Sequence, residues 1–147
     1  MMVLFAATAA AVWGIDRLIK FQIVTQFVLN QPVPVWPPVF YLTHVQNRGA
    51  AFGLFPALSQ IYLVIGVLVS VTIAAYMIKN RSGVSRLVSV AMGLIGGGTI
   101  SNLGDRALRG AVIDYLDFRF WPVFNIADIA INVGVALLLF AWWRTNK

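Results

Sequence analysis

The sequence predicts an all-α membrane protein with four transmembrane helices, a small extracytoplasmic β segment and a loop beside it. Of its 147 residues, 60% are hydrophobic and only 11% are charged, whereas domains that fold in water carry about 25% charged residues. The mean hydropathy is +0.83, and so short a chain cannot bury so many apolar side chains in a core surrounded by water. These values disfavour a disordered chain, a coiled coil and a Rossmann-type enzyme dissolved in water.

Four stretches are long and apolar enough, or nearly so, to cross a bilayer, which takes roughly 20 residues in a helix. They cover residues 1–20, 58–78, 87–103 and 123–143. The small residues of the first stretch also suggest a cleaved signal peptide, but its start lacks basic residues, and Asp16 and Lys20 follow too soon. Because neither a repeat nor a low-complexity linker is visible, residues 1–147 are expected to form a single integral-membrane domain.

The connections between the spans differ in length and character. A short basic turn, residues 79–86, joins the second and third spans, whereas residues 21–57 and 104–122 form long connections. The first long connection contains four prolines, and residues 39–45 then alternate in a way typical of β structure. We therefore expect an extended segment in the first long connection and a loop in the second.

Threading the four spans up and down the membrane separates the charges. One face receives all five acids, namely Asp16, Asp105, Asp114, Asp117 and Asp128. The opposite face receives five cations and no acid, namely Lys79, Arg81, Arg86, Arg144 and Lys147. A strict count of Lys and Arg, six on the acid face against five on the other, does not decide the orientation. Several of the six lie close to an Asp in sequence and are candidate ion-pair partners, so we discount them. Because cytoplasmic loops are enriched in Lys and Arg, we place the acid-free face in the cytoplasm and the aspartates on the extracytoplasmic face. The cations form no dense stripe, which favours anionic lipid head groups over nucleic acid as partners.

The reactive residues limit the chemistry. The chain has no Cys, no Glu and a single His, His44, which disfavours thiolate nucleophiles, disulfides and His-based metal clusters. Carboxylate chemistry must therefore come from the aspartates. Two alternatives are an ion or proton relay through Asp128 in a small transporter, and a serine–lysine protease that pairs Lys20 with Ser101 or Ser59.

Three motifs have a structural interpretation. Asp16 precedes Lys20 by four residues, which is the favourable geometry for an ion pair on one helix, and we favour a supporting role over a catalytic one. Gly93 and Gly97 form a small-xxx-small pattern that favours close helix packing. The small residues within 47–53 would let the backbone approach a ligand or the second span closely.

The remaining acids have two interpretations each. Asn125 followed three residues later by Asp128 is a helix-start signature, so capping of the helix alone can explain Asp128. An acid that enters the membrane can equally have a function there, and the spacing alone favours neither interpretation. A position at a helix start favours the ionised form of Asp128. Asp114 and Asp117 lie in an apolar, aromatic stretch, where a solvated loop acid is favoured for Asp117 but not for Asp114. Apolar surroundings would raise the pKa of Asp114.

Taken together and in order, these motifs resemble those of the lipoprotein signal peptidase (signal peptidase II) family. The shared segments are the Asp16-xxx-Lys20 pair and residues 47–52, 97–106, 112–114 and 124–128, which cover nearly the whole chain in order. The sequence departs from the family at Thr99, Ser101 and Gly104, where Ala, Gly and a larger aliphatic residue are usual. These departures concern the packing of the third span and no acid.

The resemblance implies a four-helix aspartic endopeptidase of the bacterial inner membrane that removes signal peptides from diacylglyceryl-modified prolipoproteins, cutting before the lipidated cysteine. It implies a catalytic pair of Asp114 and Asp128, a β-cradle before Asn47 and a mobile lid around Asp114. Substrate-binding roles are implied for Asn47, Gly49, Asn102, Asp105, Arg106 and Asn125, and supporting roles for Asp16 and Lys20. We expect lipidated prolipoproteins and the phospholipid bilayer as partners, no nucleic acid, no cofactor or metal, and a monomer.

Overall fold

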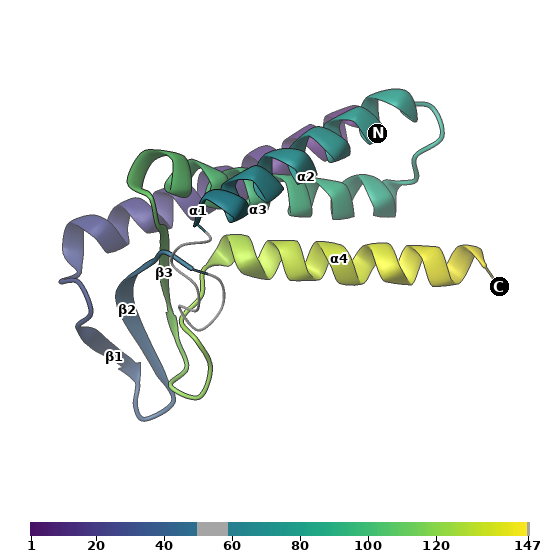
Figure 1. Ribbon diagram of the computed structural model, residues 1–147. Coiled ribbons are helices and arrows are strands. Elements are labelled where there is room, and N and C mark those ends of the chain that lie inside the picture. Colours follow the sequence, from purple (N-terminus) through teal and green to yellow (C-terminus); the bar gives the residue numbers. More distant parts are fainter. Residues whose placement is uncertain (50–58, 147) are drawn as a thin grey trace.

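The computed structural model describes residues 1–49 and 59–146. In chain order, the elements of this part are α1 (Met2–Gln26), β1 (Pro32–Trp36), β2 (Phe40–Asn47), α2 (Ser59–Lys79), α3 (Arg86–Arg109), β3 (Val112–Asp117) and α4 (Ile126–Thr145). The helices form an elongated bundle, and the sheet projects from the end at which α4 begins (Figure 1). Both chain termini lie at the opposite end of the bundle.

All four helices are long and apolar enough to cross a membrane, as the sequence predicts. Two of them extend beyond the predicted spans. Helix α1 continues to Gln26, because Asp16 and Lys20 form an ion pair within it and so do not end the helix. Helix α3 continues to Arg109, where Gly110 adopts the left-handed conformation that commonly ends a helix.

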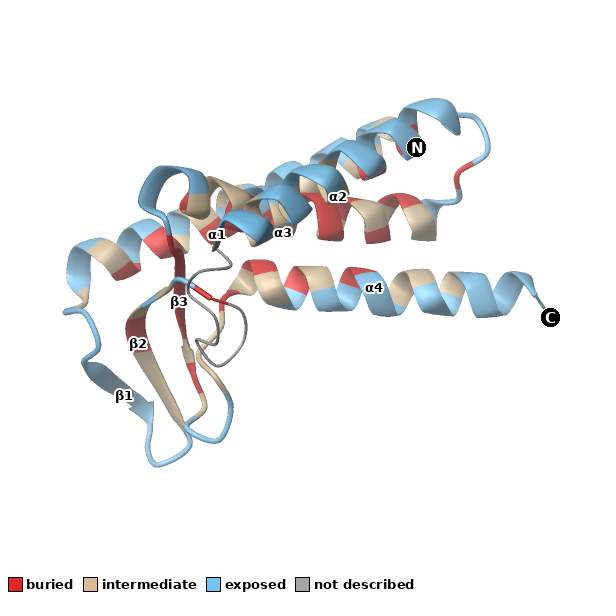
Figure 2. Cartoon of the chain, viewed as in Figure 1, coloured by how far each residue is buried: buried red, intermediate tan, exposed pale blue. Residues whose placement is uncertain are grey.

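The other two spans differ from the prediction at their starts. Helix α4 begins at Ile126, because the side chain of Asn125 caps its first turn. The predicted start of the second span, Leu58, lies outside the described residues. Figure 2 shows that the outward faces of α2 and α4 are mostly exposed, and large apolar side chains such as Leu68 and Leu139 cover them. These faces have the character of a lipid-contacting surface.

The sheet has three antiparallel strands in the order β1-β2-β3. The predicted extended segment corresponds to β2, whereas β1 and β3 were not predicted as strands. Strand β1 contains Pro32 and Pro34 and lies at an edge of the sheet, where proline is tolerated because no partner needs its missing N–H. The prediction of a loop around Asp114 is wrong, because the backbone there pairs with β2, with Ile113 opposite Gln46.

An apolar cluster fixes this sheet to the end of the bundle. Ile113 and Tyr115 of β3 are fully buried and pack with Ile23 of α1. Because side chains alternate between the two faces of a strand, Val112 and Asp114 point the other way and line a cavity. The cluster therefore holds β3 in the register that presents Asp114.

The predicted close packing around the glycines of α3 is confirmed. Helix α3 contacts α1, α2 and α4, which makes it the central helix of the bundle. A Cβ atom on Gly97 would lie 2.5 Å from the carbonyl oxygen of Ala9 in α1. A Cβ atom on Gly98 would lie 2.5 Å from the carbonyl oxygen of Ala127 in α4. The backbones of α1 and α4 thus approach α3 as closely as only glycine allows.

We expect Gly98→Ala to lower the free energy of unfolding by about 1–3 kcal/mol, because the added methyl group must push α4 away from α3. Denaturation in detergent measures this loss. Gly14→Ala is the matched control, because a Cβ atom at Gly14 meets nothing within 4 Å and the change should leave stability equal or slightly higher. Equal stability of the two variants would contradict the close packing.

Candidate active site

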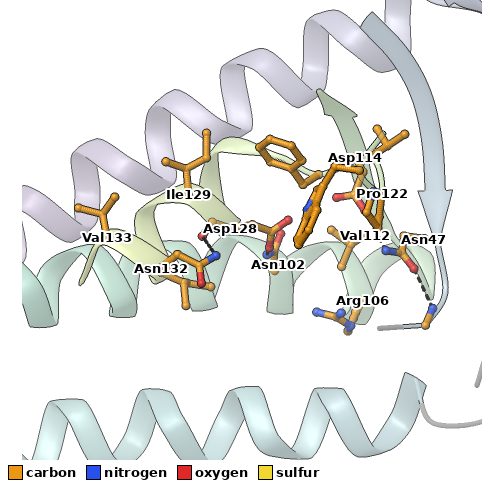
Figure 3. A pocket seen from close by; sticks show the side chains of 15 residues that line it. Asn47, Asn102, Arg106, Val112, Asp114, Pro122, Asp128, Ile129, Asn132 and Val133 are labelled. Carbon is orange, nitrogen blue, oxygen red and sulfur yellow. Dashed lines mark hydrogen bonds between the residues drawn. The ribbon is translucent and has the colours of Figure 1, made fainter. Parts of the chain in front are cut away.

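A cavity of about 480 Å³ opens where α3 ends, α4 begins and the strands β2 and β3 meet the bundle. Figure 3 shows Asp114 and Asp128 among its lining residues, with Asn102 and Arg106 close by. The polar lining residues of this cavity are Asn47, Asn102, Arg106, Asp114, Asp128 and Asn132, and Val112, Pro122, Ile129 and Val133 contribute to its apolar walls. The two acids that the resemblance implies as a pair, 14 positions apart in sequence, therefore face one space.

Asp114 lies on β3 with only 2% of its surface exposed. Its two carboxylate oxygens accept hydrogen bonds from amide groups, one from Asn125 at 2.7 Å and one from Asn47 at 2.9 Å. Burial, followed by the nearby charge of Asp128, raises the pKa of Asp114 to about 7, although the two amides oppose the shift. The direction of this shift is the one predicted from the sequence.

Asp128 occupies the first turn of α4 and takes part in its cap. Its Oδ2 accepts from the backbone N–H of Asn125 at 3.2 Å, and the side chain of Asn125 accepts from the N–H of Asp128 at 2.9 Å. This reciprocal arrangement is a capping box. The other oxygen, Oδ1, accepts from Asn102 at 2.7 Å. Capping and a position in the cavity, which the sequence left as alternatives, therefore coexist in the same side chain.

Two asparagine amides connect the acids and have a defined polarity. The Oδ1 atom of Asn102 accepts from Lys20 at 2.9 Å and from Asn125 at 3.1 Å, so its NH₂ group faces Asp128. The Oδ1 atom of Asn125 faces the N–H of Asp128, so its NH₂ group faces Asp114. Because an ammonium and a backbone N–H can only donate, they fix which end of each amide is turned toward the acids.

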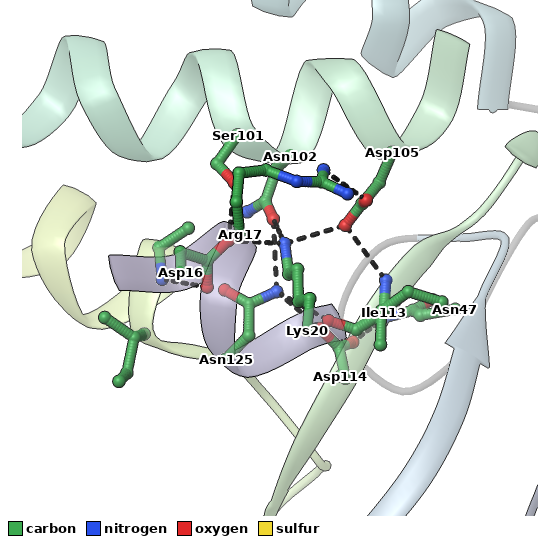
Figure 4. Close-up of polar contacts among 12 residues, drawn as sticks. Asp16, Arg17, Lys20, Asn47, Ser101, Asn102, Asp105, Ile113, Asp114 and Asn125 are labelled. Carbon is green, nitrogen blue, oxygen red and sulfur yellow. Dashed lines mark hydrogen bonds and ion pairs between the residues drawn. The ribbon is translucent and has the colours of Figure 1, made fainter. Parts of the chain in front are cut away.

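Lys20 is 1% exposed and sits behind the cavity at the centre of an ionic cluster, shown in Figure 4. Its Nζ atom lies 2.7 Å from Asp16, 2.7 Å from Asp105 and 2.9 Å from Asn102, so its three N–H groups have three acceptors. Arg17 adds a second cation at 2.6 Å from Asp105. The predicted pair of Asp16 and Lys20 is confirmed, as part of a larger cluster that joins α1 to α3.

Asp16 connects this cluster to α4. Its Oδ1 atom accepts from the backbone N–H of Ala127 at 3.2 Å, and its Oδ2 atom accepts from the hydroxyl of Ser101 at 2.5 Å. Ser101 therefore donates to a carboxylate and does not contact Lys20, which itself contacts two carboxylates. This geometry opposes the serine–lysine alternative, since a lysine base must be neutral. The side chain of Ser59 lies outside the described part of the chain.

The remaining sequence-predicted residues fall into two groups. Asn47, Gly49, Asn102 and Arg106 line the cavity. Asp105 and Asn125 are not among its described lining residues and lie behind it. Asp105 is fully buried, bonded to Lys20, Arg17 and the backbone N–H of Ile113. Residues 50–52 of the Asn47 motif lie outside the described residues.

Arg106 reaches the cavity from the last turns of α3. Its guanidinium carbon lies 5.5 Å from the centre of the Tyr62 ring, which is the geometry of a cation–π contact. Its Nε atom is buried and has no hydrogen-bond partner among the described residues. A buried donor of this kind is costly unless a ligand or water satisfies it, and Arg106 lines the same cavity as the two acids.

The prediction that Asp117 is a solvated loop acid is wrong. Its side chain accepts hydrogen bonds from the Thr43 hydroxyl at 2.7 Å and from the backbone N–H of Arg119 at 2.9 Å, and it forms an ion pair with the Arg119 guanidinium at 3.1 Å. Burial favours a higher pKa for Asp117, but these donors outweigh it, and the pKa is lowered. Asp117 thus joins β3 to β2, directly through Thr43 and indirectly through Arg119, which stacks on Tyr41 of β2.

Two residues of the site were not singled out from the sequence. Asn132 lines the cavity one turn after Asp128 and donates to its backbone carbonyl at 2.9 Å. Tyr115 is buried against α1, and its hydroxyl accepts from the backbone N–H of Ile126 at 3.2 Å. An amide four residues after an intramembrane acid is a signal that could have identified Asn132. No local pattern indicates the contact of Tyr115, which joins β3 to α4.

Comparison with known proteins gives consistent matches. The sequence profile of a family described as signal peptidase (SPase) II matches residues 8–144. A lipoprotein signal peptidase of Halothermothrix orenii is 42% identical over 133 residues, which cover 90% of this chain and 90% of that protein. A lipoprotein signal peptidase of Desulfitobacterium hafniense is 47% identical over 135 residues, which cover 90% of this chain and 87% of that protein.

Solved structures agree with the sequence matches. A structure described as a bacterial membrane enzyme superposes with a TM-score of 0.89 at 25% identity, covering 100% of this chain and 92% of that chain. A second one with the same description has a TM-score of 0.84 at 26% identity, covering 97% and 94% of the two chains. The similarity extends over the helices and the sheet alike.

We expect Lys20→Met to lower the free energy of unfolding by about 3–5 kcal/mol, because it leaves Asp16 and Asp105 buried without their common cation. Lys79→Met is the matched control, because Lys79 is exposed at the other end of the bundle and its loss should cost little. Denaturation of both variants in the same detergent measures the difference. Two variants of equal stability would show that the buried cluster adds nothing to the fold.

Proposed function

The chain belongs to the signal peptidase II family, and we propose that it works as an aspartic endopeptidase in which Asp114 and Asp128 are the catalytic pair. The observation that carries this proposal is the kind of partner that each aspartate has. Asp16, Asp105 and Asp117 each contact a cation, which favours the charged form of a carboxyl group. Among the described residues, Asp114 and Asp128 instead accept hydrogen bonds from amide groups alone.

Amide donors leave a pair of carboxyl groups free to share one proton. Two neighbouring carboxylates resist being ionised together, so such a pair binds and releases protons as a unit. A pKa of about 7 for Asp114 means that it holds a proton in a large fraction of molecules at neutral pH. Asp128 lies at a helix N-terminus, which favours its ionised form. We therefore assign the proton-bearing role to Asp114 and the base to Asp128.

The proposed reaction uses the pair as acid and base. Ionised Asp128 takes a proton from a water molecule as the water oxygen attacks the scissile carbonyl carbon, while Asp114 donates its proton to the carbonyl oxygen. A tetrahedral diol results, with Asp128 protonated and Asp114 ionised. Asp128 then protonates the leaving nitrogen, and Asp114 takes back a proton from the diol as the C–N bond breaks. The pair returns to its starting state.

The surroundings of the pair suit an extended peptide next to lipid. The unpartnered Nε of Arg106 and the amide of Asn47 lie at the cavity, where they would donate to substrate carbonyl groups. On the other side, Ile129 and Val133 of α4 line the cavity and remain about half exposed on the outer surface of the helix. This apolar wall would accept the acyl chains of a diacylglyceryl-modified prolipoprotein while the bond before its lipidated cysteine reaches the acids.

The family and the four apolar helices identify a multi-pass bacterial membrane protein. We further propose that residues 1–147 form one domain that acts as a monomer, with no nucleic-acid partner, no cofactor and no metal. The pair would lie at the extracytoplasmic face of the inner membrane. The charge asymmetry supports this orientation, since residues 79–86 carry three cations and no acid.

We expect Asp114→Asn and Asp128→Asn each to reduce kcat/KM for a diacylglyceryl-modified prolipoprotein by at least about 100-fold, because each change removes a proton-transferring group and keeps its shape. Asp117→Asn is the matched control from the same strand as Asp114, and it should keep most of the activity. Cleavage in detergent, followed by gel shift of the product, measures all three. Near-normal cleavage by either pair variant would contradict the aspartic mechanism.

The substrate class is tested in the same assay with the unlipidated precursor of the same protein. The unchanged enzyme should cleave the lipidated form much faster, because the apolar wall contributes binding energy only when acyl chains are present. Equal cleavage of both forms would contradict the proposed substrate while leaving the catalytic pair in place.

The pKa of Asp114 predicts a loss of activity at alkaline pH. kcat/KM should fall as the pH rises above about 7, because Asp114 then loses the proton that it donates. Folding stability should also fall as the pH rises from about 4 to 7, because the folded chain binds this proton more tightly than the unfolded chain does. Asp114→Asn should reduce this fall in stability, and Asp117→Asn should retain both effects. Activity that stays constant to pH 9 would exclude Asp114 as the acid.

A further inference from the structure

A second cavity lies at the end of the bundle far from the aspartates. It has a volume of about 870 Å³ and is formed mainly by the start of α3 and the last turns of α4. Figure 1 places both of these segments at the end where the chain terminates. We call this end, comprising residues 79–88 and 138–146, the basic end. A cavity of this volume is large enough for a drug-sized ligand or for part of a larger, chain-like one.

The cavity exists because α3 and α4 stop packing closely toward this end. Gly134 of α4 sits against α3, where an added Cβ atom would lie 2.7 Å from the carbonyl oxygen of Ala91. Beside that contact and toward the basic end, the larger side chains of Val88, Met92 and Leu138 line the space between the helices. The result is a wedge with apolar walls that opens toward the basic end.

Two cationic side chains line the open end of this cavity. Arg86 and Arg144 both line the cavity and are exposed, and the side chain of neither makes a hydrogen bond or an ion pair with another described residue. Along α3 the apolar wall extends from Val88, two residues after Arg86, to Met92, six residues after it, and along α4 Leu138 precedes Arg144 by six residues; these separations are about 3–9 Å along a helix. Positive charge at one end of the cavity and apolar walls that extend about 9 Å from it match the polarity of an anionic phospholipid.

The distribution of charge over the whole chain strengthens this match. The end with the aspartates holds six cations against five acids, whereas residues 79–88 and 138–146 hold four cations and no acid. Four of the six net positive charges therefore belong to the basic end. Basic pockets between membrane helices are suited to anionic head groups.

We propose that this cavity binds one anionic phospholipid of the bilayer. Its phosphate lies between Arg86 and Arg144, and an acyl chain fills the wedge against Val88, Met92 and Leu138. The lipid then bridges α3 and α4 at the end where their own packing is loose. This site is independent of the catalytic pair, which lies at the other end of the bundle.

Native mass spectrometry of the full chain, with phosphatidylglycerol or phosphatidylcholine added to the detergent, tests the proposal. One phosphatidylglycerol should be retained in preference to phosphatidylcholine. The double variant Arg86→Gln/Arg144→Gln should weaken retention on the order of 25-fold, because each Arg near a lipid surface contributes about fivefold. Arg81→Gln is the matched control, because it removes a charge from the same end but is not among the described residues lining this cavity; it should change retention by less than twofold.

Each other outcome contradicts the proposal. Equal retention of the two lipids would exclude selection of the head group. A loss for Arg81→Gln equal, per charge, to that of the double variant would indicate diffuse attraction rather than a site. Complete displacement of the lipid by inorganic phosphate would identify a free-anion site that makes no use of the apolar wedge.

A measurement on the unchanged protein covers the case in which the double variant fails to fold. Phosphatidylglycerol in the micelle should raise the melting temperature relative to phosphatidylcholine at the same mole fraction, since a ligand that binds only the folded chain stabilises it. Inorganic phosphate at the same phosphate concentration should not produce this rise. Equal melting temperatures in the two lipids would overturn the proposal.

Discussion

The contact on which the rest of the site depends is the burial of one ammonium group between three acceptors. Lys20 bonds to Asp16, Asp105 and Asn102 and has almost no exposure to solvent. An uncompensated charge at this depth would be strongly destabilising, so the three acceptors must keep their positions. Two of them belong to α3, and Asp16 also accepts from the start of α4. One cation therefore sets how α1, α3 and α4 meet beneath the cavity.

This cluster also determines the chemistry of the cavity without entering it. Lys20 takes the oxygen of the Asn102 amide, which leaves the NH₂ group for Asp128. The ammonium group of Lys20 does not contact Asp128 directly, because the side-chain amide of Asn102 lies between them. A cation in direct contact would favour a carboxylate that cannot hold a proton. The network thus orients Asp128 through an amide and keeps a direct cation away from it, as the proposed exchange of protons between Asp114 and Asp128 requires.

The sequence predicts those features that depend on neighbours in the chain. The four spans, the pairing of Asp16 with Lys20 and the cap of α4 follow from composition or from spacings of three and four residues. Strands β1 and β3 could not be predicted in this way, because β1 contains prolines and β3 depends on pairing with a distant strand. The partners of Asp105 and Asp117 were missed for the same reason, since Lys20 and Thr43 are far from them in sequence.

The position of Asp114 on a strand rather than in a loop has a consequence for how the pair is assembled. Ile113 and Tyr115 anchor β3 to α1 on one face of the strand, so Asp114 on the other face is fixed by the same buried contacts. Asp128 is fixed by the cap of α4 and by the close approach of α4 to Gly98. Both acids therefore stand on regular elements joined through α1 and α3, which is the arrangement that holds reacting groups to within a fraction of an ångström. Because Ile129 and Val133 line the cavity and are also exposed on the outer face of α4, a substrate of the proposed reaction would reach this pair from the bilayer without separating the helices.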